Sequence, residues 1–238
     1  MVDVTLTERL VRELKAASGP ASGGDIARAL GVSRTAVWKQ VRSLRRLGYE
    51  IEATPRVGYR LAGVPDVPYP WELRDGLETK RFGRSAYHFD TVGSTQHEVR
   101  RLADADAPEG TVVVAEEQRA PKARMGRSYV TPRGGLWFSL LFRPARSPEA
   151  VIALSLLAAV AVHQGIEEVT GLRPTVRWPN DLLHDGRKLV GILVEMDSEQ
   201  DLLRYAVVGV GVNVNVSERD FPEELRPIAT SLREALGR

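Results

Sequence analysis

The sequence contains no cysteine, which excludes disulfides, thiolate metal sites and a cysteine nucleophile. Its histidines, His88, His97, His163 and His184, show none of the spacings typical of metal ligands. No apolar run approaches the ~20 residues that span a bilayer, and the N-terminus lacks the basic-then-apolar pattern of a signal peptide. We therefore expect a cytoplasmic protein.

Several common catalytic motifs are missing as well, namely a Walker loop, an H-E-x-x-H motif and a Ser/His/Asp arrangement. The segment G-V-G-V-N-V-N resembles a dinucleotide fingerprint only superficially, because it lacks the third glycine and the following helix. Its valines continue a strand pattern instead. The glycines therefore indicate a close approach by a ligand or by a crossing element of the fold.

The composition is that of a soluble globular protein, with 43% hydrophobic and 27% charged residues. A length of 238 residues allows one large domain, or a small domain and a medium one. The net charge is only +2, but residues 34–46 carry five cations and no acid. This local asymmetry indicates an anionic partner.

The basic stretch lies in a predicted helix-turn-helix. Apolar spacing predicts a helix over residues 5–17, a short helix over 25–30 and a second one over 34–47, with Ser33 as its N-cap. Residues 49–61 read as two strands joined at 55–58, which form a basic wing. This pattern predicts a winged DNA-binding domain, although a helical module that docks a protein remains an alternative.

In that domain Val41 and Leu44 are expected to face inward, which leaves the basic side of the helix for a DNA groove. Lysine and arginine there would chiefly contact phosphate, and base reading would fall to the remaining side chains. The candidate DNA-binding residues are Arg34, Thr35, Trp38, Lys39, Arg42 and Arg56.

Residues 63–73 contain three prolines and are predicted to be a linker. The expected domains are therefore a winged helix-turn-helix over 1–62, the linker over 63–73 and a second domain over 74–238.

The second domain alternates predicted strands and helices. Strands are expected at 87–90, 111–116, 136–142, 175–178, 188–196 and 202–216. A helix is expected to follow Ser94 or Thr95 as its cap, and an apolar core helix is expected over 151–162. Residues 118–127 are irregular and basic, which indicates either an anion-binding loop or an exposed flexible loop.

The stretch R-W-P-N-D-L-L-H-D-G-R-K-L-V-G-I-L-V-E, residues 177–195, gives the sharpest local signal. Asp185-Gly186 between apolar segments is typical of a hairpin, because Gly readily adopts a positive φ. Lys188 is then expected at the start of a strand, held by backbone hydrogen bonds. A plain surface lysine beside a turn is the alternative reading of the residue taken alone.

Taken in order, these motifs resemble a known family. A winged helix-turn-helix followed by S-T-Q, A-E-x-Q, a basic loop, R-W-P-N-D, R-K-L-V-G-I-L-V-E and G-V-G-V-N-V-N is similar to the bifunctional biotin–protein ligases that double as biotin operon repressors. The resemblance covers almost the whole chain. It implies an α+β fold in which a mixed-sheet, class II synthetase-like ligase domain follows the winged helix-turn-helix.

The resemblance also implies the chemistry. Such enzymes join biotin and ATP, with Mg²⁺, into biotinyl-5′-AMP and pyrophosphate, and they then transfer biotin to a lysine of the biotin carboxyl carrier domain of acetyl-CoA carboxylase. Operator DNA is the second partner. A homodimer in the adenylate-bound state is expected by analogy.

The resemblance assigns roles by motif position. Lys188 and Arg124 are the expected catalytic residues. The expected biotin-binding residues are Ser94, Thr95, Gln96, Gln118, Lys122, Ala123, Arg124 and Lys188. The expected ATP- and adenylate-binding residues are Arg124, Arg127, Trp178, Asn180, Asp181 and Asn213, and the metal ligands remain unassigned.

Two departures from the family pattern affect these expectations. The basic loop of the family reads G-R-G-R-R-G, whereas residues 121–126 read P-K-A-R-M-G. Pro121 fixes φ and removes an N–H where glycine would allow close approach to a ligand. The second departure is that the small C-terminal β domain of the family is expected to be absent, as in a truncated or a divergent member.

Two alternatives to an active ligase follow from this. One is a catalytically impaired, biotin-responsive DNA-binding regulator, which the altered loop and the early end of the chain favour. The other is a protein similar to lipoate or octanoate ligases, against which the W-P-N-D motif and the winged domain argue.

Overall fold

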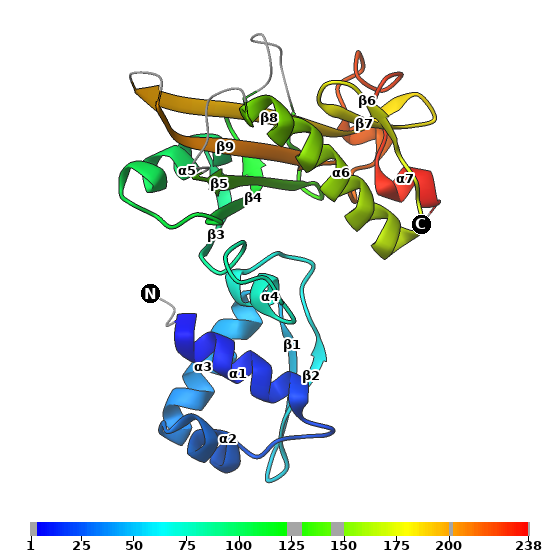
Figure 1. The fold of residues 1–238 in the computed structure, drawn as a ribbon. Helices are drawn as coiled ribbons and strands as arrows, with labels where there is room; N and C mark the ends of the chain where they lie inside the picture. Colours follow the sequence, from blue (N-terminus) through cyan, green and yellow to red (C-terminus); the bar gives the residue numbers. More distant parts are fainter. Residues whose placement is uncertain (1–3, 123–129, 144–149, 200–201, 238) are drawn as a thin grey trace. The chain divides into compact units, whose positions relative to one another are not determined.

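The computed structural model describes residues 4–122, 130–143, 150–199 and 202–237 (Figure 1). Its contacts divide the chain into two compact units, Met1–Asp75 and Gly76–Arg238.

The first unit is the predicted winged helix-turn-helix. It begins with α1 (Val4–Ala16), α2 (Gly23–Leu30) and α3 (Arg34–Arg46), and its wing pairs β1 (Glu50–Thr54) with β2 (Gly58–Gly63) antiparallel. Ser33 caps α3 as predicted, since its side chain accepts a hydrogen bond from the Ala36 N–H at 3.1 Å. Gly31, with φ of 69°, makes the turn between α2 and α3.

The segment predicted to be a linker, residues 63–73, lies within this first unit. Its Pro70 starts a short helix, α4 (Pro70–Arg74), in the N1 position that suits proline. Trp71 is buried in the core of the unit, and its Nε1 donates to Tyr49 Oη at 2.6 Å. The proline content indicated only a linker. The aromatic side chains beside the prolines supply the apolar surface that anchors this segment in the core.

The second unit is built on one mixed seven-stranded sheet in the order β3-β4-β5-β9-β8-β7-β6. Only β3 and β4 are parallel, and every other neighbouring pair is antiparallel. The strands are β3 (Ala86–Val92), β4 (Val112–Gln118), β5 (Leu136–Phe142), β6 (Thr175–Arg177), β7 (Asp181–His184), β8 (Arg187–Glu199) and β9 (Leu202–Val212). The expected mixed-sheet α+β class is confirmed.

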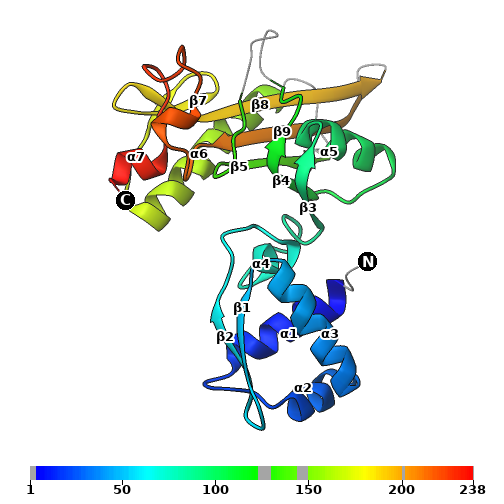
Figure 2. The same cartoon turned by 180° about the vertical axis from the view of Figure 1, so that it is seen from behind.

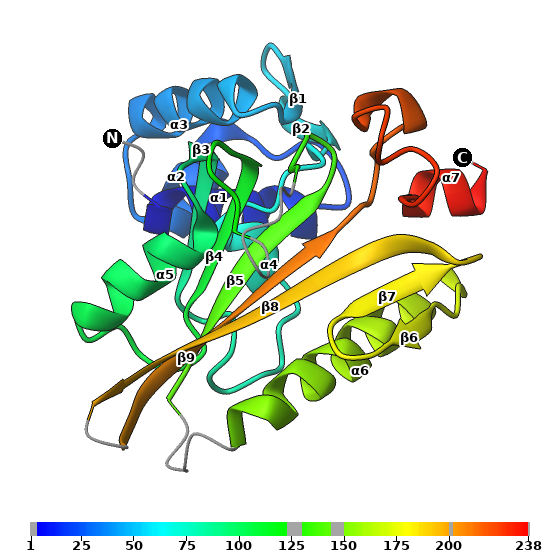
Figure 3. The ribbon, with the colours of Figure 1, turned by 90° about the horizontal axis from the view of Figure 1, so that it is seen from above.

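Two helices, α5 (Thr95–Asp104) and α6 (Ala150–Thr170), cover opposite faces of this sheet (Figures 2 and 3). Side chains alternate between the faces along β9. Gly209 lies under Gln96 of α5, whereas Val208, Val210 and Val212 face α6. A 3-10 helix, η2 (Glu218–Asp220), and a short helix, α7 (Leu232–Leu236), follow β9.

The core helix predicted over 151–162 is present as the first part of α6 and packs against the sheet, but it is not buried on every side. Ala159 of α6 is buried against the sheet, but Leu156, Leu157 and Val160 are 50%, 62% and 43% exposed. An open apolar pocket of about 800 Å³ is also lined by α6 on one side and by β5 and β9 on the other. The first part of the helix is apolar on most of its faces, but only one of its sides has a partner among the described residues. No helix in the described part of the chain is long and apolar enough to cross a membrane.

Candidate functional site

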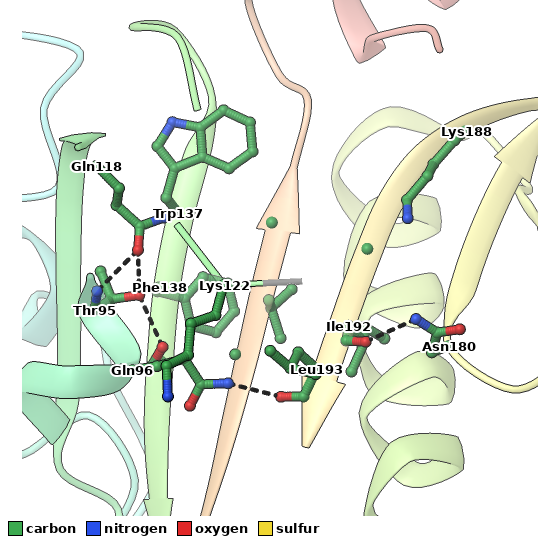
Figure 4. A pocket seen from close by; sticks show the side chains of 15 residues that line it. Thr95, Gln96, Gln118, Lys122, Trp137, Phe138, Asn180, Lys188, Ile192 and Leu193 are labelled. Atoms are coloured by element: carbon green, nitrogen blue, oxygen red, sulfur yellow. Dashed lines mark hydrogen bonds between the residues drawn. The ribbon is translucent and has the colours of Figure 1, made fainter. Parts of the chain in front are cut away.

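A cleft opens on the α5 face of the sheet, where β5, β9 and β8 lie side by side (Figure 4). Its floor contains three glycines, Gly191 of β8 and Gly209 and Gly211 of β9, of which Gly191 and Gly211 are direct register partners. A Cβ atom at Gly209 would lie 2.7 Å from Gln96 Nε2. The close approach predicted from these glycines is thus made by the side chain of Gln96.

One side of the cleft carries a chain of polar contacts. Gln118 Oε1 accepts hydrogen bonds from the Thr95 N–H at 2.8 Å and from Thr95 Oγ1 at 3.1 Å. Thr95 Oγ1 also lies 2.8 Å from Ser139 Oγ. Ser94 occupies the N-cap position as predicted, but its side chain makes no capping bond. Gln118 from β4 satisfies the first helical N–H instead.

Two buried oxygen atoms beside this chain have no partner among the described residues, Gln96 Oε1 and Ser94 Oγ. The amide nitrogen of Gln96 donates to the Leu193 carbonyl at 3.0 Å, so the orientation of the amide is fixed. A buried oxygen without a donor is destabilising by about 1–3 kcal/mol. Gln96 also lines the cleft, so a ligand with an N–H group would remove part of that cost.

Lys188 lies across the glycine floor from Thr95 and Gln118 (Figure 4). The predicted hairpin is present, with φ of 47° at Asp185 and 75° at Gly186. The Lys188 N–H donates to the Ile228 carbonyl at 2.7 Å, and its carbonyl accepts from the Thr230 N–H at 2.9 Å. The expectation of a lysine held at a strand start by backbone hydrogen bonds is therefore confirmed.

Asp181 is the acidic partner of Lys188. Its Oδ1 lies 2.8 Å from Lys188 Nζ, and its Oδ2 lies 2.6 Å from Arg177 Nη2. Burial by itself would raise the pKa of the Asp181 carboxyl, but hydrogen bonds and charges from Lys188 and Arg177 outweigh burial and hold this pKa below its ordinary value. The carboxylate thus stays ionised beside the lysine.

The lowered pKa of Asp181 predicts a pH dependence of stability. A carboxyl whose folded pKa is depressed stabilises the fold above its ordinary pKa of 3.8, and this contribution is lost as the pH falls through the folded value. We expect the difference in unfolding free energy between the wild type and Asp181→Asn to be greatest near neutrality and to shrink in acid. Chemical denaturation at a series of pH values measures it, and Asp185→Asn, whose side chain is 82% exposed, is the matched control. A difference that stayed constant into acid would contradict the assignment.

The structure brings some other predicted site residues to the cleft and leaves others outside it. Lys122 and Asn180 line it, and Asn180 Nδ2 donates to the Ile192 carbonyl at 3.0 Å. Asn213 is buried outside the lining, where Nδ2 donates to the Thr230 carbonyl at 2.8 Å. Trp178 is 78% exposed and does not line the cleft. Ala123, Arg124 and Arg127 lie outside the described residues.

The sequence did not indicate a site role for several residues in or beside the cleft, among them Trp137, Ser139 and Glu195. Trp137 and Ser139 line the cleft from within the strand L-W-F-S-L-L-F. The signal for Ser139 was a lone hydroxyl in an otherwise apolar run, which indicates a buried polar partner. Glu195 contacts Lys122, and nothing in its local sequence indicated that.

The described residues contain no group of three or more His, Cys, Asp or Glu side chains that could hold a metal ion. Asp181 is the acidic side chain beside Lys188, and it is already bound to two cations.

The surface of α3 in the first unit matches the predicted DNA-facing side. Val41 and Leu44 are buried, whereas the predicted contact residues Arg34, Thr35, Trp38, Lys39 and Arg42 are exposed. The Arg42 guanidinium lies 4.8 Å from the centre of the Trp38 ring. Arg56 is exposed at the tip of the wing, and together with Arg34 it lines a groove beside the start of α2.

Comparison with known proteins identifies the family. A model of an HTH domain matches residues 7–60, and the model of the biotin/lipoate A/B protein ligase family matches residues 89–213. The chain belongs to the biotin/lipoate A/B protein ligase family. The residues matched by this family model include Thr95, Gln118 and Lys188, on which the cleft is built.

Two curated relatives and one solved structure illustrate the relationship. The bifunctional ligase/repressor BirA of Bacillus subtilis is 48% identical over 217 residues, which are 91% of this chain and 67% of that protein. BirA of Escherichia coli is 31% identical, covering 81% of this chain and 59% of its own length. The biotin protein ligase from Aquifex aeolicus in complex with biotin and ATP superimposes with a TM-score of 0.54 at 32% identity, over 65% of this chain and 62% of that one. The chain thus spans about two thirds of the length of its relatives in the biotin/lipoate ligase family.

Proposed function

We propose that this protein is an ATP-dependent biotin–protein ligase joined to a DNA-binding transcriptional repressor domain. The observation that carries the proposal is the cleft itself. It combines amide and hydroxyl groups on one side, a glycine floor and two lysines, Lys122 and Lys188. The relatives named above, and the occupied ligase structure, support this function.

The polar side of the cleft suits the ureido ring of biotin. That ring offers two N–H donors and one carbonyl acceptor, and Gln96 Oε1 is a buried acceptor without a donor among the described residues. A dithiolane ring or an alkyl chain, as in lipoate or octanoate, would leave that oxygen unsatisfied. Biotin is therefore favoured over the acyl substrates of the lipoate ligases.

The proposed reaction has two steps. A carboxylate oxygen of biotin attacks the α-phosphorus of ATP and expels pyrophosphate, which gives biotinyl-5′-AMP. The ε-amine of a lysine on the carrier domain of acetyl-CoA carboxylase then attacks the acyl carbon, forms an amide and releases AMP and a proton. Both steps build negative charge on oxygen, which Lys188 and Lys122 would stabilise, since both line the cleft.

Magnesium would enter with the nucleotide. Because the described residues lack a cluster of metal ligands, such an ion would be bound chiefly by phosphate oxygens. When bound, it would neutralise phosphate charge. The chain's own part would be to orient the carboxylate and the α-phosphate beside Lys188.

The test is an assay with biotin, Mg·ATP and the carrier domain. We expect biotin-dependent release of labelled pyrophosphate and transfer of biotin to the carrier lysine. Release that stayed at background at every protein concentration would overturn the ligase proposal. We also propose that the protein forms a homodimer when it binds the adenylate. The molar mass of the protein in the same mixtures tests this.

A biotin-responsive regulator without turnover is the second candidate. Pro121 and Ala123 replace glycines of the family's loop pattern, which favours it. Biotin binding without pyrophosphate release in the assay above would identify this second function.

The first unit is proposed to bind DNA through α3 and the wing. Because its exposed cations would contact phosphates, affinity for a mixed-sequence duplex is expected to fall steeply with salt. Arg42→Gln should lower the slope of log K against log salt by about one, as expected for one lost phosphate contact. Arg101→Gln, in the second unit, is the control and should keep the wild-type slope. An unchanged slope for Arg42→Gln would remove that residue from the interface.

A further inference from the structure

Glu195 binds two cations at the edge of the cleft. Its carboxylate oxygens lie 3.1 and 3.3 Å from Lys122 Nζ, and Oε1 also lies 3.3 Å from Arg100 Nη2 of α5. Glu195 follows Gly191 and Leu193 at spacing two along β8, so strand alternation puts all three on the cleft side of the sheet. The carboxylate thus lies beside the lysine that faces the ligand.

The surroundings of this cluster are partly desolvated. The side chains of Lys122, Glu195 and Arg100 are 28%, 23% and 33% exposed, and Arg100 Nε is buried without a partner among the described residues. In such a setting charges interact more strongly than they do in water. The sum of the charges is +1 with Glu195 ionised, and it would be +2 if that carboxylate were neutral.

We propose that Glu195 is a positioning residue that holds Lys122 at the cleft before the ligand arrives and then shares this lysine with the carboxylate of the ligand. The inference rests on the proposed biotin site. Glu195 fixes the lysine through a hydrogen bond and at the same time reduces the positive field that an anionic ligand meets. It therefore determines how strongly the cleft prefers a charged tail over a neutral one.

Glu195→Gln separates the hydrogen bond of Glu195 from its charge. Glutamine keeps a hydrogen-bond acceptor and the size of the side chain, but it carries no charge. We expect this variant to bind biotin about three- to tenfold more tightly than the wild type, since Lys122 would no longer be shared with a second carboxylate and its charge would act on the ligand alone. The affinity for biotinamide, which has the same rings and a neutral tail, should change less than twofold. The gain for biotin should shrink with added salt.

A double-mutant cycle tests whether Glu195 acts through Lys122. In a Lys122→Gln background the gain from Glu195→Gln should fall to less than half, because the shared lysine is gone. Glu167→Gln on α6, on the opposite face of the sheet, removes one charge as a matched control and should leave both affinities unchanged.

Isothermal titration calorimetry of the full chain with biotin and with biotinamide measures all of these variants. The role of Glu195 would be overturned by any of three results. These are equal affinity changes for the two ligands, a weaker affinity for biotin in Glu195→Gln, and the same gain in affinity with and without Lys122. Such results would leave the ligase proposal standing. A wild-type protein that bound neither ligand would overturn both.

Discussion

Replacing Lys188 by alanine is expected to lower the rate of biotinyl-adenylate formation by about 10²–10³-fold, the usual loss when one preorganised charge stabiliser is removed. The side chain of Lys188 faces the cleft, and the negative charge of the transition state would develop in front of it (Figure 4). Biotin-dependent exchange of labelled pyrophosphate into ATP measures this step directly. Lys188→Arg should retain part of the rate, because the charge remains while its geometry changes.

The alanine variant should fold. The backbone hydrogen bonds of Lys188 to Ile228 and Thr230 do not involve its side chain, and Asp181 keeps its ion pair with Arg177 at 2.6 Å. Lys80→Ala, at an exposed position outside the cleft, is the control for loss of a lysine. A wild-type exchange rate in Lys188→Ala would show that the assignment of Lys188 is wrong.

A side chain at position 58 is expected to unfold the first unit and abolish DNA binding. Gly58 has φ of 139°, and a Cβ there would lie 2.1 Å from the Ala21 carbonyl oxygen. That oxygen accepts the Tyr59 N–H at 2.8 Å in the bridge that joins the wing to the start of α2. Gly58→Ala therefore strains the backbone and breaks the bridge, at a combined cost of about 3 kcal/mol or more.

Gly19→Ala is the matched control, because a Cβ at Gly19 meets nothing within 4 Å. Thermal unfolding and duplex DNA binding measure the two variants side by side. Biotin binding should survive in both, since each change lies in the first unit and the proposed biotin cleft in the second. A Gly58→Ala protein that bound DNA with wild-type affinity would show that the wing tolerates displacement from α2.

Local patterns predicted those parts of the fold in which neighbours in sequence determine the geometry. The Asp185-Gly186 turn, the Ser33 cap and the alternation of β8 are of this kind. The strand predicted over 202–216 ends at Val212, because Asn213 leaves the ladder and donates to the Leu189 carbonyl and, through its side chain, to the Thr230 carbonyl. The pattern of valines gave no sign of this partner 17 residues away.

The parts that could not be predicted depend on contacts between distant segments. The apolar composition of α6 is compatible with burial on all sides, and only the tertiary structure decides how many sides have a partner. In the same way, Thr95, Gln118 and Ser139 meet where α5 packs on the paired strands β4 and β5, which no single segment encodes. The motif order singled out residues that line one cleft, such as Gln118, Lys122 and Lys188, but it did not reveal Glu195 as the partner of Lys122.

The backbone of Lys188 is fixed on both sides, and this limits how the site can adapt to a ligand. Hydrogen bonds to Ile228 and Thr230 hold its N–H and its carbonyl, and Asn213 Nδ2 donates to the carbonyl acceptor of Thr230 beside them. Adjustment at this position is thereby confined to the torsions of the lysine side chain. A lysine can lose about 2 kcal/mol of rotamer entropy when it is fixed, and the contact with Asp181 at 2.8 Å has already restricted those torsions. If the proposed nucleotide binds here, the ammonium group would shift from the Asp181 carboxylate toward a phosphate by side-chain rotation alone, while the strand that carries it stays in place.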